Sequence, residues 1–153
     1  MDSKLFFQYC QKLVILSEDL GSVLFARRQG EQDYDGLYSF IGGKMETSDA
    51  SLLAGMKREK DEEIGPDARV KVLPNESRNI LFIKKDGSCM VLPHIAGVFV
   101  GGEIVLSEEY SEYKWVKFED IDALEPKIDN TVEMAAWAKG RLSEADDSDF
   151  VEI

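Results

Sequence analysis

Three glutamates in one short segment have the residue type and the spacing of a metal site. Glu59, Glu62 and Glu63 stand in the run 58–65, and at roughly 100° per residue they share about 100° of arc on a helix. Such carboxylates repel one another unless a cation neutralises them, and Mg²⁺ is the expected ion, with Mn²⁺ as an alternative. Upstream, an apolar strand end runs into Gly42-Gly43, which would bring backbone close to that ion. The pattern indicates a site for a metal-bound phosphate, whereas a solvated acidic helix face is the simpler alternative.

The same segment resembles the signature of the Nudix hydrolases, G-x5-E-x7-R-E-U-x-E-E-x-G-U, in which U is a bulky apolar residue. The chain reads Gly43-x5-Asp49-x8-Arg58-Glu59-Lys60-Asp61-Glu62-Glu63-Ile64-Gly65-Pro66. It departs from the signature in four ways: Asp49 replaces a glutamate, one extra residue precedes Arg58, and Lys60 and Pro66 replace apolar residues. We expect the Lys60 stem to cover the apolar stripe of the helix while its ammonium reaches water or a carboxylate.

The resemblance implies roles for the acidic residues. It implies that Glu59, Glu62 and Glu63 bind Mg²⁺ with a backbone carbonyl near Gly42, and that Arg58 orients these carboxylates. The family hydrolyses phosphoanhydrides, so a carboxylate must also accept a proton from the attacking water. The candidates for this base are Glu59 or Glu62 on the helix, and Glu109 or Glu112 in the loop and strand start before Trp115.

The sequence says less about the substrate. Arg27 and Arg28 could meet phosphates, with a solvated strand end as the alternative. Tyr34, Tyr38 or Phe40 could stack a base, although core or surface packing explains each of them at least as well. We expect Mg²⁺-dependent hydrolysis of a nucleoside diphosphate linked to another moiety, nucleoside triphosphates included. The alternatives are a nucleotide sugar resembling ADP-ribose, a dinucleoside polyphosphate, or a non-catalytic nucleotide sensor on the same fold.

Composition limits the class of protein and its partners. A chain of 153 residues with net charge −12 predicts one domain, residues 1–153, that does not bind nucleic acid. It has no run of about 20 apolar residues and no secretory leader in residues 1–16, which predicts a cytoplasmic protein without a membrane partner. We expect two free buried thiols at Cys10 and Cys89, with a disulfide as the alternative; a homodimer is compatible with the sequence.

Periodicity and turn residues predict a mixed α/β protein. Strands are expected at 12–16, 22–26, 37–41, 77–84, 89–100 and 113–116, and Asp86-Gly87 predicts a hairpin. Pro93 suggests a bulge or an edge, and His94 is expected to be structural. One helix is expected from Asp49 to Gly65, capped by Ser48 or Asp49, and another over 131–142. Residues 143–153 read as a frayed acidic tail, although its apolar residues could dock. The resemblance refines this α/β class to the Nudix-type α/β/α sandwich.

Overall fold

In the computed structural model, which describes residues 4–153, nine strands form one mixed sheet. The strands are β1 (Gln8–Leu16), β2 (Ser22–Arg28), β3 (Tyr38–Ser39), β4 (Ile41–Lys44), β5 (Arg69–Val72), β6 (Arg78–Ile83), β7 (Cys89–Gly101), β8 (Tyr110–Lys117) and β9 (Val151–Glu152). The helices are α1 (Leu52–Ile64) and α2 (Thr131–Glu144), with single 3₁₀ turns at Phe118–Asp120 and Asp147–Asp149. The expected mixed α/β fold is confirmed. Residues 1–3, part of the segment expected to lack a leader, lie outside the described residues.

The centre of the sheet is the parallel pair β1 and β7, whose registered partners run from Gln8↔Met90 to Leu16↔Val98. All other strand pairs are antiparallel: β4 joins β1, β8 joins β2, and both β5 and β6 join β7. The two central strands are rich in β-branched and other apolar residues, as strands covered on both faces are. The sheet therefore has a buried middle from which both faces are built.

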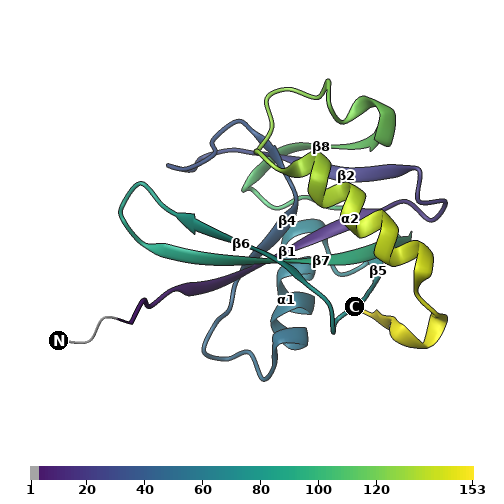
Figure 1. Cartoon of the computed structure of the whole chain (residues 1–153), viewed down its shortest axis with the longest axis horizontal. Coiled ribbons are helices and arrows are strands. Elements are labelled where there is room, and N and C mark those ends of the chain that lie inside the picture. Colours follow the sequence, from purple (N-terminus) through teal and green to yellow (C-terminus); the bar gives the residue numbers. More distant parts are fainter. Residues whose placement is uncertain (1–3) are drawn as a thin grey trace.

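Each face of the sheet is covered by one helix (Figure 1). Successive residues of a strand point to opposite faces, so β1 contributes to both cores. Its residues Leu13 and Ile15 pack in the core under α1, whereas Val14 and Leu16 pack in the core under α2. Burial of these two apolar layers is the main stabilising term of the fold.

The structure corrects two expectations about element boundaries. Helix α1 begins at Leu52 rather than near Asp49, because Ser51 is the N-cap and its side chain accepts from the Ala54 amide at 3.0 Å. The strand expected at 37–41 is divided into β3 and β4, which pair with β2 and β1 respectively. The Gly42-Gly43 pair therefore belongs to strand β4 and is not a turn.

The predicted frayed tail is wrong, because residues 143–153 continue α2 and then return to the sheet. Strand β9 pairs with β5, and the Ile153 amide donates to the Val70 carbonyl at 2.8 Å. The Ile153 side chain is buried in the core under α1. Acidic composition suggested fraying, but the apolar end of the chain has a place in the core.

Three smaller expectations can be compared with the structure: the place of Pro93, the state of the two cysteines, and membrane spans. Pro93 lies in strand β7, which pairs with β1 on both sides of this residue, at Tyr9↔Val91 and at Lys12↔His94. Pro93 therefore does not mark an edge of the sheet. Cys10 and Cys89 are free thiols, the first buried and the second half-buried. Neither α1 nor α2 has the length and hydrophobicity that crossing a membrane requires.

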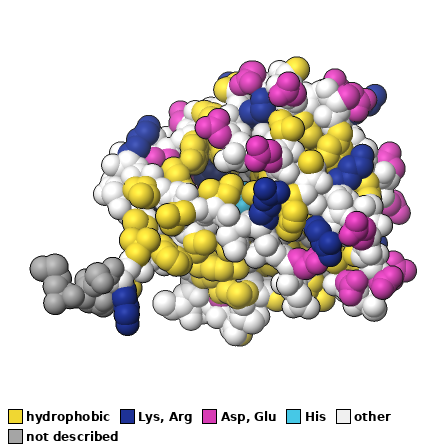
Figure 2. Space-filling model, viewed as in Figure 1, with side chains coloured by type: hydrophobic (Ala, Val, Ile, Leu, Met, Phe, Trp, Pro, Cys, Tyr) yellow, Lys and Arg dark blue, Asp and Glu magenta, His cyan; other side chains and the backbone are white. Residues whose placement is uncertain are grey.

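One surface of the molecule is unusually apolar for so acidic a chain. Figure 2 shows hydrophobic side chains gathered beside the N-terminal end. Large apolar side chains of the N-terminal segment and of β6 are exposed, namely Leu5, Phe6, Phe7, Leu81 and Ile83. Strand β6 pairs with β7 on one side, so these residues lie at an edge of the sheet.

Candidate active site

Helix α1 presents its acidic side chains toward strand β4. Ser51 caps its first turn, and Gly65 ends it with φ of 94°, a backbone conformation that suits glycine. The side-chain amide of Gln11 on β1 donates to the Leu52 carbonyl at 3.1 Å and so fastens the start of the helix to the sheet. The helix is therefore fixed at its beginning by β1 and along its length by β4.

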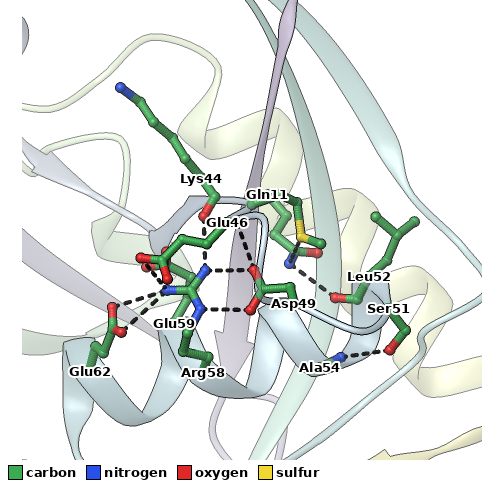
Figure 3. A network of polar contacts seen from close by, with 11 residues as sticks. Gln11, Lys44, Glu46, Asp49, Ser51, Leu52, Ala54, Arg58, Glu59 and Glu62 are labelled. Carbon is green, nitrogen blue, oxygen red and sulfur yellow. Dashed lines mark hydrogen bonds and ion pairs between the residues drawn. The ribbon is translucent and has the colours of Figure 1, made fainter.

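Arg58 is the centre of a polar network that links the helix to the preceding loop (Figure 3). Its Nε and Nη2 bind the two carboxylate oxygens of Asp49 at 2.8 and 2.9 Å, a bidentate ion pair. Its Nη1 donates to Glu59 at 2.9 Å and to Glu62 at 3.2 Å, and Nη2 also reaches the Lys44 carbonyl at 2.9 Å. The hydrogen bonds from Arg58 lower the pKa of Asp49 to about 2. Arg58 thus orients two of the three glutamates, as the resemblance implied.

Two departures from the family signature keep a structural role. Asp49 lies before the helix, so the extra residue between it and Arg58 leaves the helical phase of Arg58–Gly65 intact. Asp49 also accepts from the Glu46 amide at 2.8 Å, which closes the loop. Lys60 is fully buried; its Nζ donates to the Ala68 carbonyl at 2.7 Å and pairs with Asp61 at 2.6 Å. The expected pairing with a carboxylate is present, and the ammonium points away from the acidic face.

Buried carboxylates crowd together where α1 meets β4. Gly43 makes room for Glu59, because a Cβ at Gly43 would lie 2.0 Å from Glu59 Oε2. Burial raises the pKa of Glu59. Glu63 is only 3% exposed, and burial, with the nearby charge of Glu109, raises its pKa to about 8. Glu109, in the loop before β8, therefore lies beside Glu63 of α1.

These residues suit a hard divalent cation. A cation would relieve both the desolvation and the mutual repulsion that raise the pKa of Glu63. Within residues 4–153, no three acidic, histidine or cysteine side chains already surround a single ion position. Glu59 and Glu62 are turned toward the Arg58 guanidinium. Binding an ion would therefore require both carboxylates to turn partly away from Arg58.

A cavity of about 500 Å³ lies beside this cluster, in the range of small-ligand sites. Its aromatic lining consists of Tyr34, Phe40 and Phe82, where Tyr34 stacks on Phe82 with ring centroids 4.9 Å apart. Its basic lining includes Lys12, Arg28, Lys44 and Lys84. Both Lys12 and Arg28 are also electrostatic neighbours of Glu63. The cavity and the carboxylate cluster therefore adjoin at these two side chains.

His94 forms part of the cavity wall as a neutral, structural side chain. Its Nδ1 lies 2.9 Å from the Leu92 carbonyl, and its ring meets Phe40 edge-on at a centroid distance of 5.9 Å. Burial lowers the pKa of His94 to about 4. It therefore carries no charge near neutral pH and shapes the wall next to Phe40.

Three of the residues considered for the site lie elsewhere. Arg27 donates to the Gly36 carbonyl at 2.8 Å and stacks over Tyr38, and the Tyr38 hydroxyl donates to Glu112. None of the three residues lines the cavity, so a role of Arg27 or Tyr38 in substrate binding stays a prediction that this cavity does not support. Glu112 is held by Tyr38, and Glu109 is the loop residue beside Glu63. Phe40 lines the cavity, and so do Tyr34 and Arg28, which were considered for the same roles.

Lys12 is a cavity residue that the sequence did not single out, whereas Arg28 was considered together with Arg27. The β2–β8 ladder is irregular between Arg27 and Arg28, and only Arg28 lines the cavity. Arg28 pairs with Glu31 at 2.5 Å and lies over the Tyr110 ring. The sequence could have indicated Lys12, because this lysine directly precedes the apolar residues of β1 and a charged residue is rarely buried in a strand without a partner or a function.

A buried acidic cluster beside a cavity with basic side chains is the arrangement of an enzyme that handles phosphates with a divalent ion. Residues 12–138 match the NUDIX domain family, so the chain belongs to the Nudix family. It is a Nudix-type pyrophosphohydrolase, of the class that hydrolyses nucleoside diphosphates linked to other moieties, and the family generally uses a divalent metal. A comparison with curated proteins gives no significant match.

Solved structures share the fold at low sequence identity. The MutT protein from Methanosarcina mazei Go1 is 23% identical with a TM-score of 0.70, over 93% of this chain and 100% of that one. The NUDIX domain of Shewanella oneidensis NrtR, complexed with ADP ribose, is 18% identical with a TM-score of 0.70, over 92% and 91%. A C. elegans Ap4A hydrolase in a binary complex is 15% identical with a TM-score of 0.72, over 90% and 99%. These likenesses show the fold.

Proposed function

We propose that the protein is a Mg²⁺-dependent hydrolase of a nucleotide whose diphosphate lies against α1 and whose base lies in the cavity. The observation that carries the proposal is that Lys12 and Arg28 line the cavity and also interact electrostatically with the buried Glu63. Mn²⁺ would replace Mg²⁺ because both ions prefer oxygen ligands. Nucleoside triphosphates belong to the proposed substrate class.

Glu59, Glu62 and Glu63 would hold the ion, with a backbone carbonyl near Gly42. When bound, such an ion neutralises the diphosphate and lowers the pKa of a water molecule. Arg58 keeps Glu59 and Glu62 oriented, and Asp49 in turn fixes Arg58. Arg58 thereby holds Glu59 and Glu62 beside the proposed ion site, and both carboxylates would turn partly toward the ion when it binds.

Glu109 is the better candidate for the residue that accepts a proton from the attacking water. It lies beside Glu63, while the Glu112 carboxylate accepts a hydrogen bond from Tyr38. Glu109 is also exposed, so its carboxylate can reach a water molecule that enters with the substrate. Glu59 and Glu62 on the helix are the alternatives for this role.

The base would stack against the aromatic wall of the cavity. Phe40 and the stacked pair Tyr34 and Phe82 provide flat apolar surfaces, and aromatic stacking tolerates different bases. The side chains of Lys12, Arg28 and Lys44 supply the positive charge that an anionic substrate needs on a chain of net charge −12. The cavity lining thus offers both apolar surface for a base and basic side chains for phosphate.

The deciding experiment is turnover of a nucleotide panel with and without Mg²⁺, with both products identified. The panel should include nucleoside triphosphates, ADP-ribose and a dinucleoside polyphosphate. Glu62→Gln should lower kcat by orders of magnitude with the fold intact, whereas Glu103→Gln, an exposed turn glutamate, should leave kcat unchanged. Glu109→Gln should lower kcat strongly and Glu112→Gln should not. Nucleotide binding without turnover of any panel member would instead identify a sensor.

A further inference from the structure

On the face of β1 that α2 covers, Lys12 is the residue at which the side chains pass from the hydrophobic core to the cavity. In β1, Cys10, Lys12, Val14 and Leu16 alternate with residues that face α1. Val14 and Leu16 lie in the core under α2, whereas Cys10 and Lys12 line the cavity. Across the sheet, Lys12 is paired with Gly42 of β4 and with His94 of β7. The strand register therefore fixes the Lys12 side chain against the cavity.

The ammonium of Lys12 has no bonding partner in the protein. Among residues 4–153, no hydrogen bond or ion pair reaches its Nζ, in contrast to the buried Lys60. Partial burial lowers the pKa of Lys12, and the titratable side chains near it are Cys10, Arg28, Glu63 and Glu31. A half-buried cation without a bonded partner is costly, and a lysine beside a cavity gains from an anionic ligand there.

The position of Lys12 identifies the part of the ligand that it meets. Lys12 lines the same cavity as the apolar residues Phe40 and Leu92, and it also interacts electrostatically with Glu63 of the acidic cluster. A substrate with its base in the cavity and its reacting group at the carboxylates would bring the group between the two near Lys12. In a nucleotide this group is the phosphate chain, and a lysine binds phosphate as a compact point charge.

We propose that Lys12 binds an anionic oxygen of the phosphate chain on the cavity side of the acidic cluster. The inference rests on the proposed function for the class of ligand, and it adds a residue outside the signature segment. Arg28, which already pairs with Glu31, is less available for this contact. Of the described basic residues that line the cavity, Lys12 and Arg28 are the two that interact electrostatically with Glu63, which makes Lys12 the free cation nearest the acidic cluster.

Direct binding in EDTA tests the proposal without turnover. The probes are inorganic pyrophosphate, ADP and adenosine, titrated by calorimetry into wild type, Lys12→Met, Lys12→Gln and the control Lys117→Met. Lys117 is an exposed strand lysine on β8. One charge-assisted hydrogen bond corresponds to about a 10- to 100-fold change in Kd. We expect a loss of this size for pyrophosphate and ADP in both Lys12 variants, and unchanged adenosine binding and unchanged binding by Lys117→Met.

Two outcomes would overturn the proposal. Weaker adenosine binding with unchanged pyrophosphate binding would place Lys12 against the base, and unchanged binding of all three probes would show that Lys12 only balances the charge of Glu63. Circular dichroism of both Lys12 variants checks that the fold is kept. Failure of the wild type to hydrolyse any nucleotide would remove the proposed function, while the pyrophosphate result would still stand as a test of Lys12.

Discussion

Gly43→Ala is the sharpest test of the acidic cluster, because it moves one carboxylate without removing any charge. The new Cβ would lie 2.0 Å from Glu59 Oε2, and ordinary contact begins at 3.4 Å, so the carboxylate must retreat by about 1.4 Å. A displacement of about 1 Å in a catalytic group costs about 100-fold in rate. We therefore expect kcat/KM to fall about 100-fold, with a higher Mg²⁺ concentration needed for half-maximal rate.

The fold should survive this change. The atoms that the Cβ meets belong to the end of a flexible side chain, and φ of Gly43 lies outside the range that favours glycine. Gly140→Ala is the matched control: Gly140 is exposed on α2 with nothing within 4 Å of an added Cβ. It should keep full activity and gain about 0.5–1 kcal/mol of stability. Wild-type kcat/KM and Mg²⁺ dependence in Gly43→Ala would refute the placement of Glu59 in the site.

Three further changes probe the buried charges and the end of the chain. In EDTA the protein should lose stability as pH rises from 4.5 toward about 8, because the raised pKa of Glu63 keeps a proton on the folded protein that the unfolded chain has released. The melting temperature of Glu63→Gln should therefore depend less on pH than that of the wild type. An equal pH dependence of the two melting temperatures would contradict this reasoning. Lys60→Met should lower the free energy of unfolding in urea by about 1–2 kcal/mol, because the Ala68 carbonyl loses its hydrogen-bond donor, and KM should be unchanged. A raised KM with wild-type stability would instead place Lys60 against the substrate. Ile153→Ala should lower the free energy of unfolding by about 2–4 kcal/mol, because the Ile153 side chain is buried and its backbone is hydrogen-bonded to Val70. A loss below about 0.5 kcal/mol would mean that the end of the chain does not pack on the sheet.

The helical site could be predicted from the sequence because its information is local. Glu59, Glu62 and Glu63 are joined by helical periodicity alone, and Arg58 next to them completes the pattern. The mixed sheet was also predictable in outline, because most of its strands are marked by short apolar runs between turn residues. Wherever one element defines the arrangement, sequence spacing was sufficient.

The cavity could not be predicted because its walls depend on pairing between distant segments. Arg27 and Arg28 are neighbours in sequence, but only Arg28 lines the cavity, and the β2–β8 ladder is irregular between them. The end of the chain was misjudged for the same reason, since β9 is stable through its pairing with β5 and the burial of Ile153. The short β5, which periodicity did not reveal, supplies that partner. Such long-range pairings are set by tertiary packing.

Alternation along β1 gives folding errors a direct functional cost. Gln11 fastens α1 to the sheet, and Lys12 lies against the cavity on the opposite face. A slip of one residue against β7 would exchange these faces, placing the ammonium under α1 and the amide in the cavity. A misregistered molecule would thus be both poorly packed and unable to hold an anion. Ligand binding by this protein can therefore report the quality of its folding, and ligands in the cell would selectively protect correctly registered molecules.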